Sequence, residues 1–337
     1  MAELFADLVG QPLAVRLLEA ALARRRLAPA YLFCGPEGVG RRLAALRFSE
    51  GLLAPPDRAL LGLPALRRRL AQGNHPDLLW VEPTYSHQGQ LVPRSRAEAE
   101  GVPRRTPPQL RLEQVRELSR FLARTPVEGS RCLAVLDGAE AMAEAAANAL
   151  LKTLEEPGQG LLVLLSAAPD QLLSTIRSRC QTIPFRRLSA AELTRVLAAL
   201  PPPQPAAGEV ADAAAADHSE AVPADPPELA ELAAGSPGGL LEHRRQWRSL
   251  REGLAERLLS LGPDAIEALH LARDLSEELD GSQQLWLIDW LQLALWRRRG
   301  RPADLRRLER LRGQLRGHVQ PRLAWEVALL ELSGGLA

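Results

Sequence analysis

Tyr31-Leu32-Phe33-Cys34-Gly35-Pro36-Glu37-Gly38-Val39-Gly40-Arg41-Arg42 is the stretch of sequence that decides the fold class. An apolar run is followed by a glycine-rich turn, and a helical pattern then runs from Leu43 to Leu53. The turn matches the phosphate-loop pattern G-x-x-x-x-G-K-[ST] as far as its second glycine. A strand, a glycine-rich turn and a helix in this order predict a phosphate-binding loop in an α/β domain.

The residues after the glycines depart from the pattern. Gly35, Gly38 and Gly40 can still present backbone N–H groups to an anion at a helix N-terminus. Arg41 stands in place of the lysine that contacts the β- and γ-phosphates, and Arg42 in place of the hydroxyl that binds Mg²⁺. Guanidinium is planar and bulky, and a second cation repels Mg²⁺. The sequence predicts a loop shaped like an ATPase site that does not hydrolyse ATP.

Composition sets the broad class. The chain has 337 residues, enough for two or three domains. A hydrophobic content of 46% with 25% charged residues is typical of a soluble globular protein. The net charge of +1 argues against strong electrostatic attraction to nucleic acid or membrane. Without a long apolar span or a signal-peptide pattern, the predicted location is cytoplasmic, with no membrane partner.

The cysteines predict no metal site. Cys34, Cys132 and Cys180 are far apart in sequence and never form a C-x-x-C pair. An odd number of cysteines in a cytosolic chain argues against a disulfide framework. Cys34 and Cys132 lie in apolar runs, so we expect both to be buried.

Residues 1–187 read as alternating strands and helices, which predicts a parallel sheet covered on both faces. A Gly-, Pro-, Gln- and Arg-rich stretch at 83–108 is predicted to be a surface excursion. The predicted strands are 31–34, 78–81, 131–137, 161–166 and 182–185, and the predicted helices are 43–53, 109–124, 139–156 and 171–177.

The remaining sequence predicts helices. Residues 188–240 form a predicted small helical domain, with a helix at 190–200 and an Ala/Pro-rich disordered insertion at about 201–227. Residues 241–337 are predicted to be all-helical. Trp286 and Trp290 share a helix face. We expect them to be core residues, with a subunit contact as the less favoured alternative. The predicted helices here are 241–260, 263–279, 282–299, 302–316 and 319–333.

Asp137 ends a buried strand and is the candidate Mg²⁺ ligand of the phosphate-loop site. An active ATPase of the AAA+ type normally follows this Asp with the Glu that activates the attacking water. Gly138 stands there instead. Glu140 comes at a predicted helix start, where a carboxylate favours the helix dipole.

Arg179 follows a short predicted helix and has two interpretations. It can neutralise the negative end of that helix. Alternatively, it is an arginine finger offered to a neighbour's γ-phosphate, a group worth roughly 10³–10⁵ in phosphoryl-transfer rate. A degenerate site in the same chain favours the second interpretation.

Several segments together carry a family resemblance. They are Asp7–Gln11, Gly35–Arg42, His75-Pro76-Asp77, Ala145–Pro157 and Ser178-Arg179-Cys180. The chain resembles the delta-prime subunits of bacterial DNA polymerase III clamp loaders, which are AAA+ proteins related to the gamma/tau motor subunits. The resemblance covers about residues 5–240. The C-terminal third is similar to the family's oligomerising collar only in being all-helical.

The resemblance implies three domains: an AAA+ P-loop domain at 1–187, a lid at 188–240 and a collar at 241–337. It implies a subunit without ATPase activity of its own, in a ring of five with a delta subunit and gamma/tau motors. Arg179, flanked by Ser178 and Cys180, would face the ATP site of an adjacent motor. The assembly would load the sliding clamp on primed DNA.

Departures from the family pattern bear on which cofactors are predicted. Many relatives hold a four-cysteine zinc module after the loop helix, and Glu50 to Asn74 contains no cysteine, so no zinc is predicted. Arg67-Arg68-Arg69 there is predicted to be a solvated helix face. Gly235-Ser236-Pro237-Gly238 lacks the nucleotide-sensing Arg of the motor relatives. No cofactor is required, and the sequence leaves open whether the degenerate pocket binds ATP.

Two other functions remain as alternatives. One is an active AAA+ ATPase that uses Arg41 in place of Lys; Arg42 and Gly138 also oppose it. The other is a DNA-binding module built on Arg24–Arg26 and Arg297–Arg299. It ranks low because the clusters lack interleaved aromatic residues and the chain lacks a basic net charge.

Overall fold

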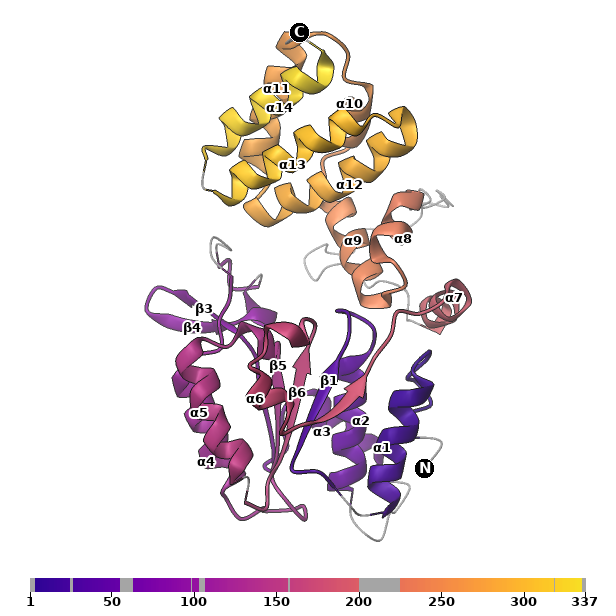
Figure 1. The fold of residues 1–337 in the computed structure, drawn as a ribbon. Helices are drawn as coiled ribbons and strands as arrows, with labels where there is room; N and C mark the ends of the chain where they lie inside the picture. Colours follow the sequence, from indigo (N-terminus) through magenta and orange to yellow (C-terminus); the bar gives the residue numbers. More distant parts are fainter. Residues whose placement is uncertain are drawn as a thin grey trace, which may run out of the picture. The chain divides into compact units, whose positions relative to one another are not determined.

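The computed structural model describes residues 4–24, 27–54, 63–97, 99–102, 107–156, 158–199, 225–317 and 319–334. The chain separates into two compact units, Met1–Glu192 and Leu193–Ala337 (Figure 1). The division into three domains at residues 187 and 240 stays a prediction. Residues 201–224 of the predicted insertion at 201–227 lie outside the described residues. Among the described residues, no helix has the length and apolar character needed to cross a bilayer.

The first unit is built on a five-stranded parallel sheet in the order β2-β5-β6-β1-β7, as the sequence predicts for its class. Cys34 pairs with Ser166, and Asp137 with Leu165, so the carboxyl ends of β1, β5 and β6 are level. The strands are β1 (Ala30–Cys34), β2 (Leu78–Val81), β5 (Leu133–Asp137), β6 (Leu161–Ser166) and β7 (Gln181–Pro184).

Helices cover both faces of the sheet because successive strand residues point to opposite sides. Phe48 of α2 packs on Tyr31 at a ring-centroid distance of 5.1 Å, on one face. Leu32 packs on the other face in a core that includes residues of α4 and α5 (Figure 1). The helices of this unit are α1 (Pro12–Arg24), α2 (Arg41–Leu53), α3 (Leu63–Ala71), α4 (Leu112–Leu122), α5 (Glu144–Glu155) and α6 (Ser174–Arg177).

The prediction of one helix over 139–156 is wrong. A 3₁₀ turn at Ala139–Ala141 comes first, and α5 begins only at Glu144. Between them the chain is extended because it bonds to Leu110: the Leu110 N–H donates to Ala141 O, and the Ala143 N–H donates to Leu110 O. An Ala/Leu-rich run carries no sign of this contact across 30 residues of sequence. The predicted helix at 171–177 is likewise split into a 3₁₀ turn, Pro169–Gln171, and α6.

The excursion at 83–108 contains a hairpin of β3 (Thr84–His87) and β4 (Gln90–Pro93). It has a small core of its own, made of Tyr85, Val92, Ala97 and Val102.

The Arg67–Arg69 stretch of α3 is solvated as predicted, because the side chains of Arg67 and Arg69 are 42% exposed and Arg68 is exposed, and two of the three arginines also form ion pairs. Arg67 donates to both carboxylate oxygens of Glu50, which is 1% exposed, and Arg69 donates to Glu128. The two ion pairs attach α3 to the rest of the first unit.

In the second unit, the regular elements at 225–317 and 319–334 are all helices, as predicted. The predicted helix 241–260 is wrong in one respect, because the chain breaks at Gly253, which has φ +76°. A short helix at Pro227–Ala233 was not predicted. The helices are α8 (Pro227–Ala233), α9 (Pro237–Ser249), α10 (Leu254–Ser260), α11 (Ala265–Glu278), α12 (Gly281–Arg299), α13 (Pro302–Arg316) and α14 (Pro321–Ser333); α7 (Ala190–Ala199) spans the boundary between the units.

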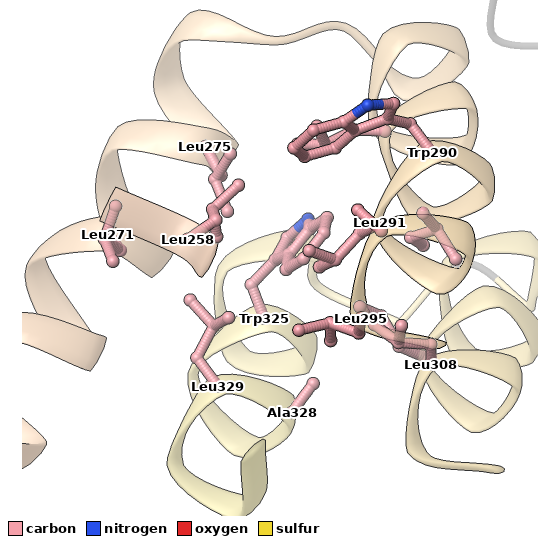
Figure 2. Packing of buried hydrophobic residues seen from close by; sticks show 14 of the residues in the cluster. Leu258, Leu271, Leu275, Trp290, Leu291, Leu295, Leu308, Trp325, Ala328 and Leu329 are labelled. Atoms are coloured by element: carbon pink, nitrogen blue, oxygen red, sulfur yellow. The ribbon is translucent and has the colours of Figure 1, made fainter. Parts of the chain in front are cut away.

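Tryptophans organise the core of this unit. Trp290 and Trp325 are 2% and 0% exposed and lie among leucines of α10, α11, α12 and α14 (Figure 2). The indole of Trp325 donates to Gln284, and that of Trp286 donates to His243 Nδ1. The prediction that Trp286 and Trp290 are core residues is confirmed.

Asp77 provides a stability test of the first unit. Its carboxylate accepts backbone N–H bonds from Val127, Glu128 and Gly129. Burial acts to raise its pKa, but these donors lower the pKa below its ordinary value, so the stabilisation is present at neutral pH and is lost as pH falls through the lowered pKa. Asp77→Asn should reduce the free energy of unfolding by about 2–3 kcal/mol in urea titrations at pH 7. Asp170→Asn, at a 93% exposed side chain, is the control; equal losses would contradict this account.

His243 provides a pH test of the second unit. Burial lowers its pKa, and its Nδ1 must stay unprotonated to accept the Trp286 bond. The unfolded chain therefore binds the proton first, and stability should fall as pH drops below about 6.5. Thermal unfolding followed by tryptophan fluorescence reports mainly on this unit, because five of the six tryptophans lie in it. His243→Gln should flatten the pH dependence, whereas the change at exposed His270, His270→Gln, should not.

Candidate functional site

The glycines of the predicted phosphate loop adopt the backbone that the motif requires. Gly38 and Gly40 have φ of +74° and +102°, values that favour glycine. A Cβ on Gly35 would lie 2.3 Å from the main-chain oxygen of Phe185, and one on Gly40 would lie 2.7 Å from Leu8. α2 begins directly after Gly40, so the loop ends at a helix N-terminus as predicted.

Gln11 fixes the back of this loop. Its amide donates to the main-chain oxygens of Val39 and Arg186, and its side-chain oxygen accepts from the Arg186 N–H. The side chain is 2% exposed. The Asp7–Gln11 segment, which the resemblance singled out, thus joins the loop to the chain that follows β7.

Arg42 and Asp137 form an ion pair where the motif would hold a metal. Arg42 Nη1 lies 3.0 Å from Asp137 Oδ2, and its guanidinium carbon lies 4.5 Å from the centroid of the Trp80 ring. Mg²⁺ needs oxygen ligands in a near-octahedral arrangement. Arg42 supplies no oxygen, brings its own positive charge and engages the candidate ligand Asp137. These residues do not fit a divalent cation.

Arg41 lies beside this pair. Its Nε and Nη1 atoms are shielded from solvent, and neither has an acceptor among the described residues. Burial lowers the pKa of the guanidinium, while the nearby charges of Glu140, Asp137 and Glu37 act in the opposite direction. Glu37 lies 3.6 Å from Arg94, so it faces another cation as well.

Glu140 lies near Arg41 in the site, and the prediction that it starts the helix 139–156 is wrong because α5 begins only at Glu144. It lies in the 3₁₀ turn after β5, and its Oε1 accepts from the Ala167 N–H at 3.1 Å. Its Oε2 is shielded and unpartnered among the described residues. Ser166, which ends β6, also has a buried hydroxyl without a partner there, and its main-chain oxygen accepts from Gly35.

Trp80, Glu140 and Ser166 were missed by sequence reasoning. The available signal was that each lies close to the end of an apolar strand, because carboxyl ends of parallel strands share one edge of the sheet.

Gly138 has φ +75°, and a Cβ there would lie 3.1 Å from Pro83. The position that holds the water-activating Glu in an active ATPase therefore has a left-handed backbone conformation here, and Pro83 occupies the space next to it. The sequence predicted the missing carboxylate but not the covering by Pro83.

Arg179 is exposed at the end of α6. Nη1 donates to Thr175 O at 3.0 Å, and Nη2 lies 2.8 Å from Glu155 Oε1. Neighbouring Ser178 also bonds Thr175 O, and burial raises the pKa of Cys180 to about 12, so this thiol stays protonated. These interactions involve none of the loop residues.

The cysteine predictions are half right. Cys132 is buried as expected, but Cys34 is only partly buried, because it ends β1 at the edge of the sheet. Burial raises the pKa of both thiols. Within the described part of the chain, no group of three His, Cys, Asp or Glu residues is arranged to hold a metal ion.

The arginine cluster at 297–299 is engaged within its own unit. Arg297 pairs with Glu228 and Glu231, and Arg299 donates to the main-chain oxygens of Leu332 and Leu261. Of the other cluster, residues 25 and 26 lie outside the described residues.

Comparison with known proteins gives two family matches. Residues 10–189, more than half of the chain, match the model described as "DNA polymerase III, delta subunit". Residues 211–332 match "Cyanobacterial DNA polymerase III delta prime, C-terminal domain".

Individual relatives agree. The chain is 39% identical over 183 residues to DNA polymerase III subunit delta' of Pseudomonas aeruginosa, covering 53% of this chain and 49% of the relative. It is 33% identical over 184 residues to the Bacillus subtilis subunit delta', covering 53% and 48%. The chain spans about half the length of these curated relatives.

Among solved structures, a DNA polymerase III gamma subunit-related protein of Thermotoga maritima matches with a TM-score of 0.50 and 16% identity, covering 94% of this chain and 98% of that one. At this identity the match concerns the fold alone. The predicted fold class, an α/β domain with a parallel sheet followed by an all-helical region, is confirmed for the described residues.

The cover over Gly138 can be tested with a matched pair of glycines. Gly138→Ala and Gly158→Ala both place a Cβ at positive φ, but nothing lies within 4 Å of the Cβ built at Gly158. Both changes should cost about 1–2 kcal/mol from backbone strain. Gly138→Ala should cost roughly 1 kcal/mol more, since Pro83 must shift. Urea unfolding of the two variants measures the difference, and equal losses would show that Pro83 yields freely.

Proposed function

Because the chain belongs to the DNA polymerase III delta subunit family, we propose that it is a non-hydrolysing delta-prime subunit of a bacterial clamp loader. In this role it assembles with delta and gamma/tau subunits, and Arg179 serves as an arginine finger at the ATP site of a neighbouring gamma/tau subunit. The assembly loads a sliding clamp on primed DNA during replication.

The ion pair between Arg42 and Asp137 is the observation that carries the first part. A motor needs a Lys on the phosphates, a metal held by hydroxyl and carboxylate, and a group that orients water. Here the carboxylate is already neutralised by the chain's own guanidinium. Gly138 supplies no carboxylate, and Pro83 leaves little room for one. We therefore expect no ATP hydrolysis by this chain alone.

The surroundings of Arg179 support the second part. Its side chain is 37% exposed and that of Glu155 is 53% exposed, so their ion pair is a surface pair worth about 0–1 kcal/mol. Turning the guanidinium from Glu155 towards a neighbour's triphosphate therefore costs little. An arginine finger, in contrast, raises the rate of phosphoryl transfer roughly 10³–10⁵-fold. The corresponding free energy is several times larger than that of the surface ion pair.

The test mixes the full chain with delta and gamma/tau subunits and measures ATP turnover. The wild-type chain should show no turnover alone and should stimulate turnover by the mixture. Arg179→Ala should remove most of the stimulation at the adjoining site while leaving assembly, measured by size, unchanged. Arg177→Ala is the matched control, because Arg177 ends α6 two residues before Arg179 and pairs with Asp170.

Two results would contradict the proposal. Undiminished stimulation by Arg179→Ala would exclude the finger. Substantial turnover by the chain alone, abolished by Asp137→Ala, would establish the active-ATPase alternative.

A further inference from the structure

The degenerate loop has two built-in cations where the motif has one lysine and a metal. Asp137 faces Arg42, and Glu37 faces Arg94. Arg41 is the remaining cation of the site, and its shielded Nε and Nη1 atoms have no hydrogen-bond partner among the described residues. The shielded donors of Arg41 are thus unsatisfied, although the carboxylates of Glu140, Asp137 and Glu37 lie near enough to act on its charge.

The shielded nitrogens of Arg41 are costly as they stand. A buried donor without an acceptor loses its bonds to water and gains nothing, and the cost is greater for a charged group. Guanidinium is a planar donor fork that matches the oxygens of a phosphate. The helix N-terminus after Gly40 favours negative charge at the same place. The buried Ser166 hydroxyl, at the neighbouring strand end, is a further donor that has no partner within the described part of the chain.

We propose that this loop binds a phosphate-bearing anion without a divalent cation, with Arg41 donating to the phosphate and Arg42 taking the place of the metal charge. Arg42 is suited to that place because Asp137 and the face of Trp80 hold it there. The inference concerns binding at the chain's own loop. It is independent of Arg179 and of any partner subunit, so it stands or falls apart from the proposed function.

The experiment is a calorimetric titration of the full chain with pyrophosphate, ADP and ATP, each with EDTA and then with Mg²⁺. The wild-type chain should bind in EDTA, and Mg²⁺ should not strengthen binding. Equal affinity for pyrophosphate and ADP would identify phosphate itself as the recognised group. Tighter binding of ADP would identify a nucleotide as the source of that phosphate.

Variants separate the two arginines. Arg41→Ala should weaken binding in EDTA roughly tenfold or more, from the loss of charge-assisted bonds. Arg68→Ala, which removes a positive charge at an exposed position on α3, should leave binding unchanged. Arg42→Thr removes the internal cation and frees Asp137, so its binding should become weaker in EDTA and be restored by Mg²⁺.

The proposal is overturned if the wild-type chain binds none of the three ligands, or binds them only with Mg²⁺. It is also overturned if Arg41→Ala and Arg68→Ala behave alike. The comparison of EDTA with Mg²⁺ uses the wild-type chain alone, so the proposal remains falsifiable even where a variant does not fold.

Discussion

The ion pair between Arg42 and Asp137 determines what the carboxyl edge of the sheet can do. It joins the first turn of α2 to the end of β5, and the Trp80 ring of β2 lies against the same guanidinium. The side chain of Arg42 is 54% exposed, so the pair forms without the full desolvation cost of a buried one. The loop, the sheet edge and the helix are therefore connected by charge with no need for a metal.

The sequence predicted those parts of the site that are encoded locally. The glycines around a helix start and the acid that ends an apolar strand are read from neighbouring residues, and the structure confirms both. The partner of Arg42 and the contribution of Glu140 depend instead on which strands lie side by side. Sheet order is set by packing between distant segments, so no local pattern reveals it. The split of the predicted helix 139–156 has the same origin, because its cause is Leu110.

Two segments that carry the family resemblance contain residues whose contacts stabilise the fold and take no part in catalysis. Gln11 is buried and holds the phosphate loop against the residues after β7. Asp77 of the His75-Pro76-Asp77 segment gathers three backbone N–H groups at 127–129. Both can be shared by active and inactive members of one fold. Resemblance at these positions therefore supports the fold, and activity must be judged at Arg41, Arg42 and Gly138.

The proposed absence of hydrolysis in this chain does not rest on a single residue. Replacing Arg42 would free Asp137, yet Gly138 would still lack a carboxylate and lie under Pro83. Pro83 is itself fixed, because its main-chain oxygen accepts from the Arg94 N–H. The next residue, Thr84, exchanges two backbone hydrogen bonds with Gln109, one from each N–H to the other's oxygen. A glutamate at position 138 thus requires the base of the β3–β4 hairpin to move. The packing around position 138 therefore opposes a carboxylate there, whereas the proposed role of Arg179 needs only that an exposed surface ion pair be broken.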